Sequence, residues 1–104
     1  MQEITVEQLK EQIDSKANFQ LVDVREAHEL EICSIGGEHI PMGEVMNNLD
    51  KISKNIPVYI HCRAGGRSGA IVNALTAKGY KNTYNVVGGI LAWADRIDTS
   101  MVKY

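Results

Sequence analysis

The hydrophobic positions of the chain fall into short apolar runs, separated by longer segments with a helical period. The runs 19–24, 57–61 and 83–87 are rich in apolar, β-branched and aromatic residues, which predicts strands. Residues 39–41 predict a further brief strand, which Pro41 terminates. The pattern therefore predicts four strands spread along the chain.

The segments between these strands carry apolar residues at helical spacing. Thr5 and Gln8 have the spacing of a capping box, which places a helix start directly after Thr5. Gly79 suits the C′ position of the helix that is expected to begin near Ser68. The expected helical segments are 6–14, 27–32, 43–54, 68–78 and 88–97.

Strands and helices alternate from one end of the chain to the other. Such alternation predicts an α/β fold, in which a parallel sheet has helices on both faces. The 104 residues suit one compact domain, and a hydrophobic content of 44% is enough to form a core. Because no repeat or linker divides the sequence, residues 1–104 are expected to form a single domain.

The composition argues against several classes of function. Lys and Arg number 11 and Asp and Glu 13, a net charge of −2, and no block of five like charges occurs, so neither nucleic-acid nor membrane binding is expected. No export signal is visible at the N-terminus. The two cysteines lie far apart, which predicts reduced thiols and a cytoplasmic location. Histidines and cysteines show no metal-ligand spacing, so no metal site is expected.

The most informative segment is the loop that follows the strand 57–61. Cys62 lies at the carboxyl end of this strand, where ligands gather in open parallel sheets. Gly65 and Gly66 permit the tight backbone curl, with positive φ, in which successive N–H groups bind an anion. The helix that begins near Ser68 adds the positive end of its dipole.

A thiol in this loop is expected to be acidic. A free cysteine titrates near ~8.5, and helix N-termini and neighbouring cations lower that value. Arg63 and Arg67 are expected to supply the cations, so Cys62 should be a nucleophilic thiolate at neutral pH. The alternative is a small buried cysteine that only packs at the end of a strand, but two glycines and two arginines are unusual neighbours for a packing residue.

A thiolate in such a loop fits both phosphate-ester hydrolysis and sulfur transfer. Protein tyrosine phosphatases are recognised by His-Cys, five residues, then Arg and Ser or Thr. Here His61-Cys62 is followed by four residues before Arg67-Ser68. A shorter loop has one N–H donor fewer and suits a single sulfur atom better than a phosphoryl group. A cysteine-dependent phosphatase or arsenate reductase is therefore the weaker hypothesis.

The chain also resembles the rhodanese family over nearly its whole length. The segments that carry the resemblance are Leu21-Val22-Asp23-Val24-Arg25-Glu26, His39-Ile40-Pro41, Cys62 to Ser68, and Gly88-Gly89-Ile90-Leu91-Ala92-Trp93. Each segment alone is a weak signal, but four in the family's order and spacing are specific. The resemblance implies a rhodanese-like fold, a five-stranded parallel sheet flanked by helices on both faces.

The resemblance also implies a reaction and its participants. Cys62 would take sulfane sulfur from a donor such as thiosulfate and pass it, as a persulfide, to a thiol, cyanide or a protein acceptor. The backbone amides of Arg63, Ala64, Gly65, Gly66, Arg67 and Ser68 would cradle the outer sulfur, and the two arginines would hold the anionic part of the donor. No metal or organic cofactor is implied. The alternative from another class is a non-catalytic rhodanese module that binds sulfide or a partner protein.

Five further residues invite a functional interpretation but favour a structural one. Arg25, with Asp23, is expected to tether loops rather than to contact the donor. His39 is expected to be a structural hydrogen-bonding residue. His61 should point away from Cys62, because neighbouring side chains alternate along a strand, and is not expected to be the base. Cys33 is expected to lie on a half-buried helix face rather than to resolve a persulfide.

Overall fold

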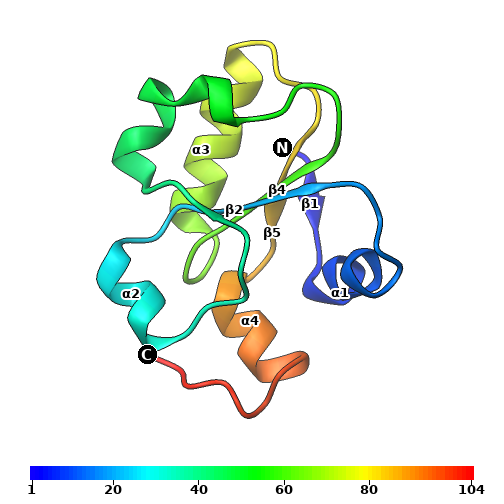
Figure 1. The fold of residues 1–104 in the computed structure, drawn as a ribbon, viewed down its shortest axis with the longest axis vertical. Coiled ribbons are helices and arrows are strands. Elements are labelled where there is room, and N and C mark those ends of the chain that lie inside the picture. Colours follow the sequence, from blue (N-terminus) through cyan, green and yellow to red (C-terminus); the bar gives the residue numbers. More distant parts are fainter.

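The computed structural model describes residues 1–104 and contains a five-stranded sheet whose paired strands are all parallel. The strand order is β1-β5-β4-β2-β3, so β4 lies at the centre of the sheet (Figure 1). The strands are β1 (Glu3–Ile4), β2 (Gln20–Asp23), β3 (Glu38–His39), β4 (Val58–His61) and β5 (Thr83–Val86). The expected five-stranded parallel sheet is confirmed.

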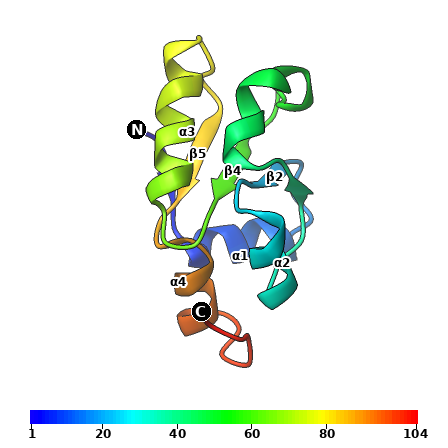
Figure 2. The same ribbon diagram turned by 90° about the vertical axis from the view of Figure 1, so that its left-hand side faces the viewer.

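Helices cover both faces of the sheet. They are α1 (Val6–Asp14), α2 (Ala27–Ile32), α3 (Gly66–Ala77) and α4 (Gly89–Arg96), together with the 3₁₀ helices η1 (Met42–Asn47) and η2 (Leu49–Lys51). Helix α1 packs against α4, and α3 packs against η1. Figure 2 shows α3 running beside β5, with α1 and α4 below the strands. No helix combines the length and the apolar character that crossing a membrane requires.

Two hydrophobic clusters join these layers to the sheet. Val58 and Ile60 of β4 belong to the cluster that contains Leu75 of α3, whereas Tyr59 belongs to the cluster that contains Leu9 of α1. The alternation follows from the period of two along a strand. Since both faces of β4 are covered, the strand is buried along its whole length, which explains its nearly continuous apolar sequence.

Local signals located several helix ends correctly. The capping box of α1 is present: Gln8 N donates to Thr5 Oγ1 at 3.1 Å, and Thr5 N donates to Gln8 Oε1 at 2.9 Å. Gly79 follows the end of α3 with a φ of +98°, as expected of a C′ glycine. Helix α3 begins at Gly66, however, which is two residues before the expected start at Ser68.

Two expectations from the hydrophobic pattern were wrong in detail. The pattern missed β1, which is only two residues long. It pairs with β5, and the residue that follows β5 also holds it, since Val87 N donates to Ile4 O at 2.9 Å. The helix expected over 43–54 is instead η1 and η2. Asn48 separates them with a φ of −131°, and its side chain donates to the Glu44 carbonyl at 2.7 Å, in place of a main-chain helical bond.

Candidate active site around Cys62

The start of α4 fixes the backbone of the loop that contains Cys62. The N–H of Ile90 donates to the Cys62 carbonyl at 3.0 Å, and the N–H of Leu91 donates to the Arg63 carbonyl at 3.1 Å. Donors that would otherwise be free at the helix N-terminus thus hold the loop directly. Gly89 permits this approach, because a Cβ at that position would lie 2.6 Å from the Cys62 carbonyl oxygen.

Donors of the loop converge on the sulfur of Cys62. The N–H of Gly65 lies 3.1 Å from Sγ, the N–H of Ser68 3.4 Å, and the Ser68 hydroxyl oxygen 3.3 Å. Gly65 has a φ of +108°, so one of the two expected glycines adopts the left-handed conformation, while Gly66 begins α3. The residue Cys62 is 1% exposed, so its sulfur lies at the floor of the loop.

The pKa of the Cys62 thiol is lowered, in the predicted direction. Burial raises it, whereas hydrogen bonds from the Ser68 hydroxyl and from the amides of Ser68, Gly65 and Ala64 lower it below the ordinary value. The amide donors agree with the expected cradle and helix start, whereas neither arginine is among the leading causes that lower the pKa of Cys62.

Both arginines of the loop are already engaged within the protein. Arg67 forms a bidentate ion pair with Glu29, with N–O distances of 2.7 and 2.8 Å. The Arg67 guanidinium holds the pKa of the Glu29 carboxyl well below its usual range. Arg63 donates from Nε to the main-chain oxygen of Tyr104 at 2.7 Å, and its guanidinium lies over the Tyr104 ring. Both arginines thus have partners within the chain, and their expected contact with the anionic part of a donor stays a prediction.

Glu29 and Tyr104 are site residues that sequence reasoning missed. The Tyr104 hydroxyl donates to Glu29 Oε1 at 2.8 Å and accepts from Arg25 Nη1 at 2.9 Å. Glu29 has a local signal, since it lies three residues after Glu26 and accepts from the Glu26 N–H at 2.9 Å, a capping-box spacing. Tyr104 has none, because its partners lie far away in the sequence.

Arg25 is a structural residue, as expected. Its side chain is fully buried and donates to both oxygens of Asp23 and to the Cys33 carbonyl. His39 Nε2 lies 2.6 Å from the Arg25 carbonyl oxygen, which confirms its structural hydrogen-bonding role. Cys33 is a half-buried free thiol.

His61 lies beside Asp23, with its Nε2 3.7 Å from the nearest carboxylate oxygen. Both ring nitrogens are buried without a hydrogen-bond partner. Burial lowers the pKa of His61, so the ring is neutral at pH 7.

These features place a cradled thiol at the carboxyl end of a central parallel strand. The sequence pattern of the family described as "Rhodanese-like domain" matches residues 5–96. The chain belongs to this rhodanese-like family.

Relatives with solved structures or curated names agree with this membership. The "Rhodanese-like Domain Protein" from Staphylococcus aureus superposes with a TM-score of 0.83 at 33% identity, covering 100% of this chain and 99% of that one. "Putative sulfur carrier protein YrkF" of Bacillus subtilis strain 168 is 35% identical over 97 residues, 92% of this chain. "Putative sulfurtransferase YtwF" of the same strain is 35% identical over 94 residues, 89% of this chain and 90% of that protein. The chain spans 52% of the length of YrkF.

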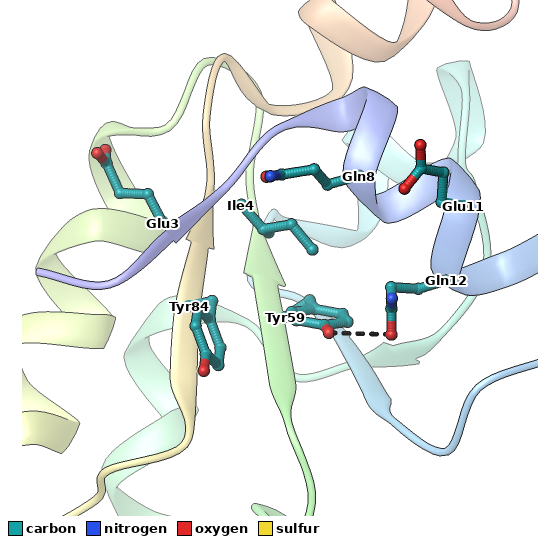
Figure 3. Close-up of a pocket in the computed structure, with 7 residues that line it drawn as sticks. All are labelled: Glu3, Ile4, Gln8, Glu11, Gln12, Tyr59 and Tyr84. Carbon is teal, nitrogen blue, oxygen red and sulfur yellow. Dashed lines mark hydrogen bonds between the residues drawn. The ribbon is translucent and has the colours of Figure 1, made fainter.

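A surface pocket of this rhodanese-like chain lies apart from Cys62. It is lined by residues of β1, α1, β4 and β5, with the rings of Tyr59 and Tyr84 packed edge to face, 5.6 Å apart (Figure 3). Tyr59 donates to Gln12 at 3.4 Å across the pocket. No residue of the Cys62–Ser68 loop lines it, so this pocket is separate from the candidate site.

Asn85 of β5 is a further site residue that the sequence did not indicate. Its Nδ2 donates to the Gly65 carbonyl at 3.2 Å, which turns its Oδ1 toward the Ser68 hydroxyl at 2.6 Å. The single hydroxyl proton of Ser68 thus has two acceptors, Asn85 Oδ1 and Cys62 Sγ. Asn85 competes with the thiolate for this proton.

We therefore expect Asn85→Asp to raise the apparent pKa of Cys62, by roughly one unit, because a nearby negative charge disfavours the thiolate and takes the hydroxyl proton. The measurement is the pH dependence of iodoacetamide alkylation in a Cys33→Ser background. Asn73→Asp on the exposed side of α3 adds the same charge and should leave the midpoint unchanged. Equal midpoints for Asn85→Asp and Asn73→Asp would contradict the assigned role of Asn85.

Proposed function

We propose that this chain is a sulfurtransferase that carries sulfane sulfur as a persulfide on Cys62. The observation that carries the proposal is the convergence of the Gly65 and Ser68 amides on the Cys62 sulfur, in a chain of the rhodanese-like family. A lowered thiol pKa supports the nucleophilic role. The names of YtwF and YrkF, a sulfurtransferase and a sulfur carrier protein, support sulfur transfer in general.

The proposed cycle has two displacement steps. The Cys62 thiolate attacks the sulfane sulfur of a donor; with thiosulfate, the sulfur–sulfur bond breaks and sulfite leaves with its electron pair. The persulfide carries its charge on the outer sulfur, which the amide donors of the loop stabilise. An acceptor thiolate or cyanide then attacks that sulfur, and the Cys62 thiolate is released. Neither step requires a cofactor.

The acceptor and the location belong to the same proposal. A protein thiol or sulfur carrier suits the second step, and the name of YrkF supports such an acceptor. Both cysteines are free thiols, which agrees with a reducing compartment, and a cytoplasmic location stays a prediction. Organisation as one domain over residues 1–104 is part of the proposal.

The test is steady-state thiocyanate formation from cyanide, with thiosulfate and with glutathione persulfide as donors. Cys62→Ser should reduce turnover to the uncatalysed rate, because a hydroxyl at that position cannot accept sulfur. Cys33→Ser is the matched control and should retain at least half of the wild-type rate. Aryl phosphate hydrolysis is measured in parallel and should be absent, since four residues separate Cys62 from Arg67. Phosphatase turnover that depends on Cys62, or sulfur transfer that does not, would overturn the proposal.

A further inference from the structure

Tyr104 contacts Arg63 of the loop that holds Cys62, and also Arg25 and Glu29 outside that loop. In Figure 1 the segment after α4 turns back toward the end of α2, and this brings Tyr104 to the site. The Arg63 guanidinium lies 5.0 Å from the centre of the Tyr104 ring and also donates to the Tyr104 main-chain oxygen. The Tyr104 hydroxyl is fixed between Arg25 and Glu29. Arg63 is therefore held by a residue whose own position is anchored by buried groups.

The engagement of the two arginines decides how much positive charge the site offers to a ligand. Arg67 is neutralised by the two oxygens of Glu29. Arg63 pairs with no aspartate or glutamate side chain, so it is the loop guanidinium that a ligand could recruit. To do so the ligand must displace the ring and the main-chain oxygen of Tyr104. A doubly negative ligand needs such a partner more than a singly charged or neutral one does.

We propose that Tyr104 is a specificity-determining residue, which holds Arg63 so that the site disfavours doubly anionic donors and favours sulfane sulfur carried on a thiol. The inference rests on the proposed sulfur transfer at Cys62. Both donor classes form the same Cys62 persulfide. Thiosulfate transfers its sulfane sulfur and releases sulfite with two negative charges, whereas a thiol persulfide releases a thiolate with one. The donors differ in the charge that must lie beside Arg63.

The first experiment measures charge selectivity at Cys62 without sulfur chemistry. Iodoacetate and iodoacetamide alkylate the thiolate with loss of iodide and differ in one negative charge. In the Cys33→Ser background, Tyr104→Ala should raise the ratio of the iodoacetate rate to the iodoacetamide rate about fivefold. The substitution removes the ring beside Arg63 and the hydroxyl bonds that anchor the Tyr104 main-chain oxygen, so Arg63 can turn to pair with the anion. The increase should shrink at high salt, since the pair is exposed to solvent. Because iodoacetamide is neutral, dividing by its rate corrects for any change in the accessibility of the Cys62 sulfur to both reagents.

A double-mutant cycle assigns the effect to Arg63. Arg63→Gln should lower the ratio slightly, and the Tyr104→Ala/Arg63→Gln double variant should match Arg63→Gln. Tyr104→Phe keeps the ring but loses the hydrogen bonds of the hydroxyl. Its ratio should lie between those of wild type and Tyr104→Ala. Val102→Ala, in the same exposed tail, is the control and should leave the ratio unchanged. An unchanged ratio in Tyr104→Ala, or an increase that persists without Arg63, would overturn the proposal.

The second experiment compares donors. Tyr104→Ala should lower KM for thiosulfate at least threefold with little change in kcat, while KM for the persulfide of 2-mercaptoethanol, which carries no carboxylate, changes less than twofold. Parallel changes for both donors would overturn the assignment of specificity. If neither donor supports Cys62-dependent transfer but the alkylation ratio still rises, the proposed function fails while the charge selection by Tyr104 stands.

Discussion

Replacing Arg25 with methionine is expected to lower the free energy of unfolding by about 3–5 kcal/mol. The substitution leaves the Asp23 carboxylate buried and without its cation, since Asp23 is 1% exposed and takes three hydrogen bonds from the Arg25 side chain. It also removes the donors to the Cys33 carbonyl and to Tyr104. A loss of this size is a large part of the stability of a domain of ordinary size.

Urea unfolding followed by the fluorescence of Trp93 measures the loss. Arg96→Met is the matched control, because Arg96 forms a half-exposed ion pair with Glu7 and should change stability by less than about 0.5 kcal/mol. Adding Asp23→Asn to Arg25→Met should recover part of the loss, since the unpaired charge is removed. Equal effects of Arg25→Met and Arg96→Met would contradict the structural role of Arg25.

The contribution of this ion pair should depend on pH with a defined sign. Burial raises the pKa of Asp23, but hydrogen bonds from the Arg25 side chain and main chain and the charge of Arg25 lower it further, so the folded pKa lies below the unfolded value of 3.8. The stabilisation is therefore complete above pH 3.8 and is lost as the pH falls toward the folded pKa. The stability difference between wild type and Arg25→Met should shrink over that acidic range.

Replacing Gly89 with alanine is expected to lower the free energy of unfolding by about 2–4 kcal/mol and to reduce sulfur transfer at least tenfold. A Cβ at this position would lie 2.5 Å from the Arg63 carbonyl oxygen and 2.6 Å from that of Cys62, and both are backbone atoms that cannot rotate away. The φ of Gly89 is also +58°, which alanine adopts at a cost. The loop must therefore move away from α4, and the cradle of Cys62 moves with it.

Gly43→Ala is the matched control for this substitution. No atom lies within 4 Å of a Cβ built at Gly43, and its φ is not positive, so alanine should be tolerated there. Urea unfolding and thiocyanate formation are measured on both variants. Full activity and wild-type stability in Gly89→Ala would show that contact with the start of α4 does not position the loop.

Local signals in the sequence predicted the parts of the fold that local contacts determine. The capping box at Thr5 and Gln8 placed α1, and the apolar run before Cys62 placed β4 and the loop after it. The alternation of strands and helices gave the parallel sheet with helices on both faces. Strand β1 could not be predicted in this way, because two residues have no period and their pairing with β5 is a long-range contact.

The sequence predicted Cys62 and the groups that donate hydrogen bonds to its sulfur. It did not predict which residues pair with the two arginines of the loop. Gly65 and Ser68 lie in the same loop as the sulfur, so spacing alone indicated their roles. Arg67 was expected to hold the anionic part of a donor, which stays a prediction, but its ion pair with Glu29, 38 residues earlier in the chain, was not predicted. Tyr104 lies 41 residues after Arg63, and no pattern links two such positions. Which arginines of a loop find a partner within the chain depends on tertiary packing, which local sequence patterns do not encode.

The central claim, that Cys62 carries transferred sulfur, is tested most directly by intact-protein mass spectrometry. The protein is treated with thiosulfate or with glutathione persulfide, then measured with and without a thiol reductant. We expect the mass to increase by that of one sulfur atom. Reductant or cyanide should remove this adduct, Cys33→Ser should retain it, and Cys62→Ser should abolish it. An adduct that survives Cys62→Ser, or the absence of any adduct from either donor on the wild-type chain, would contradict it.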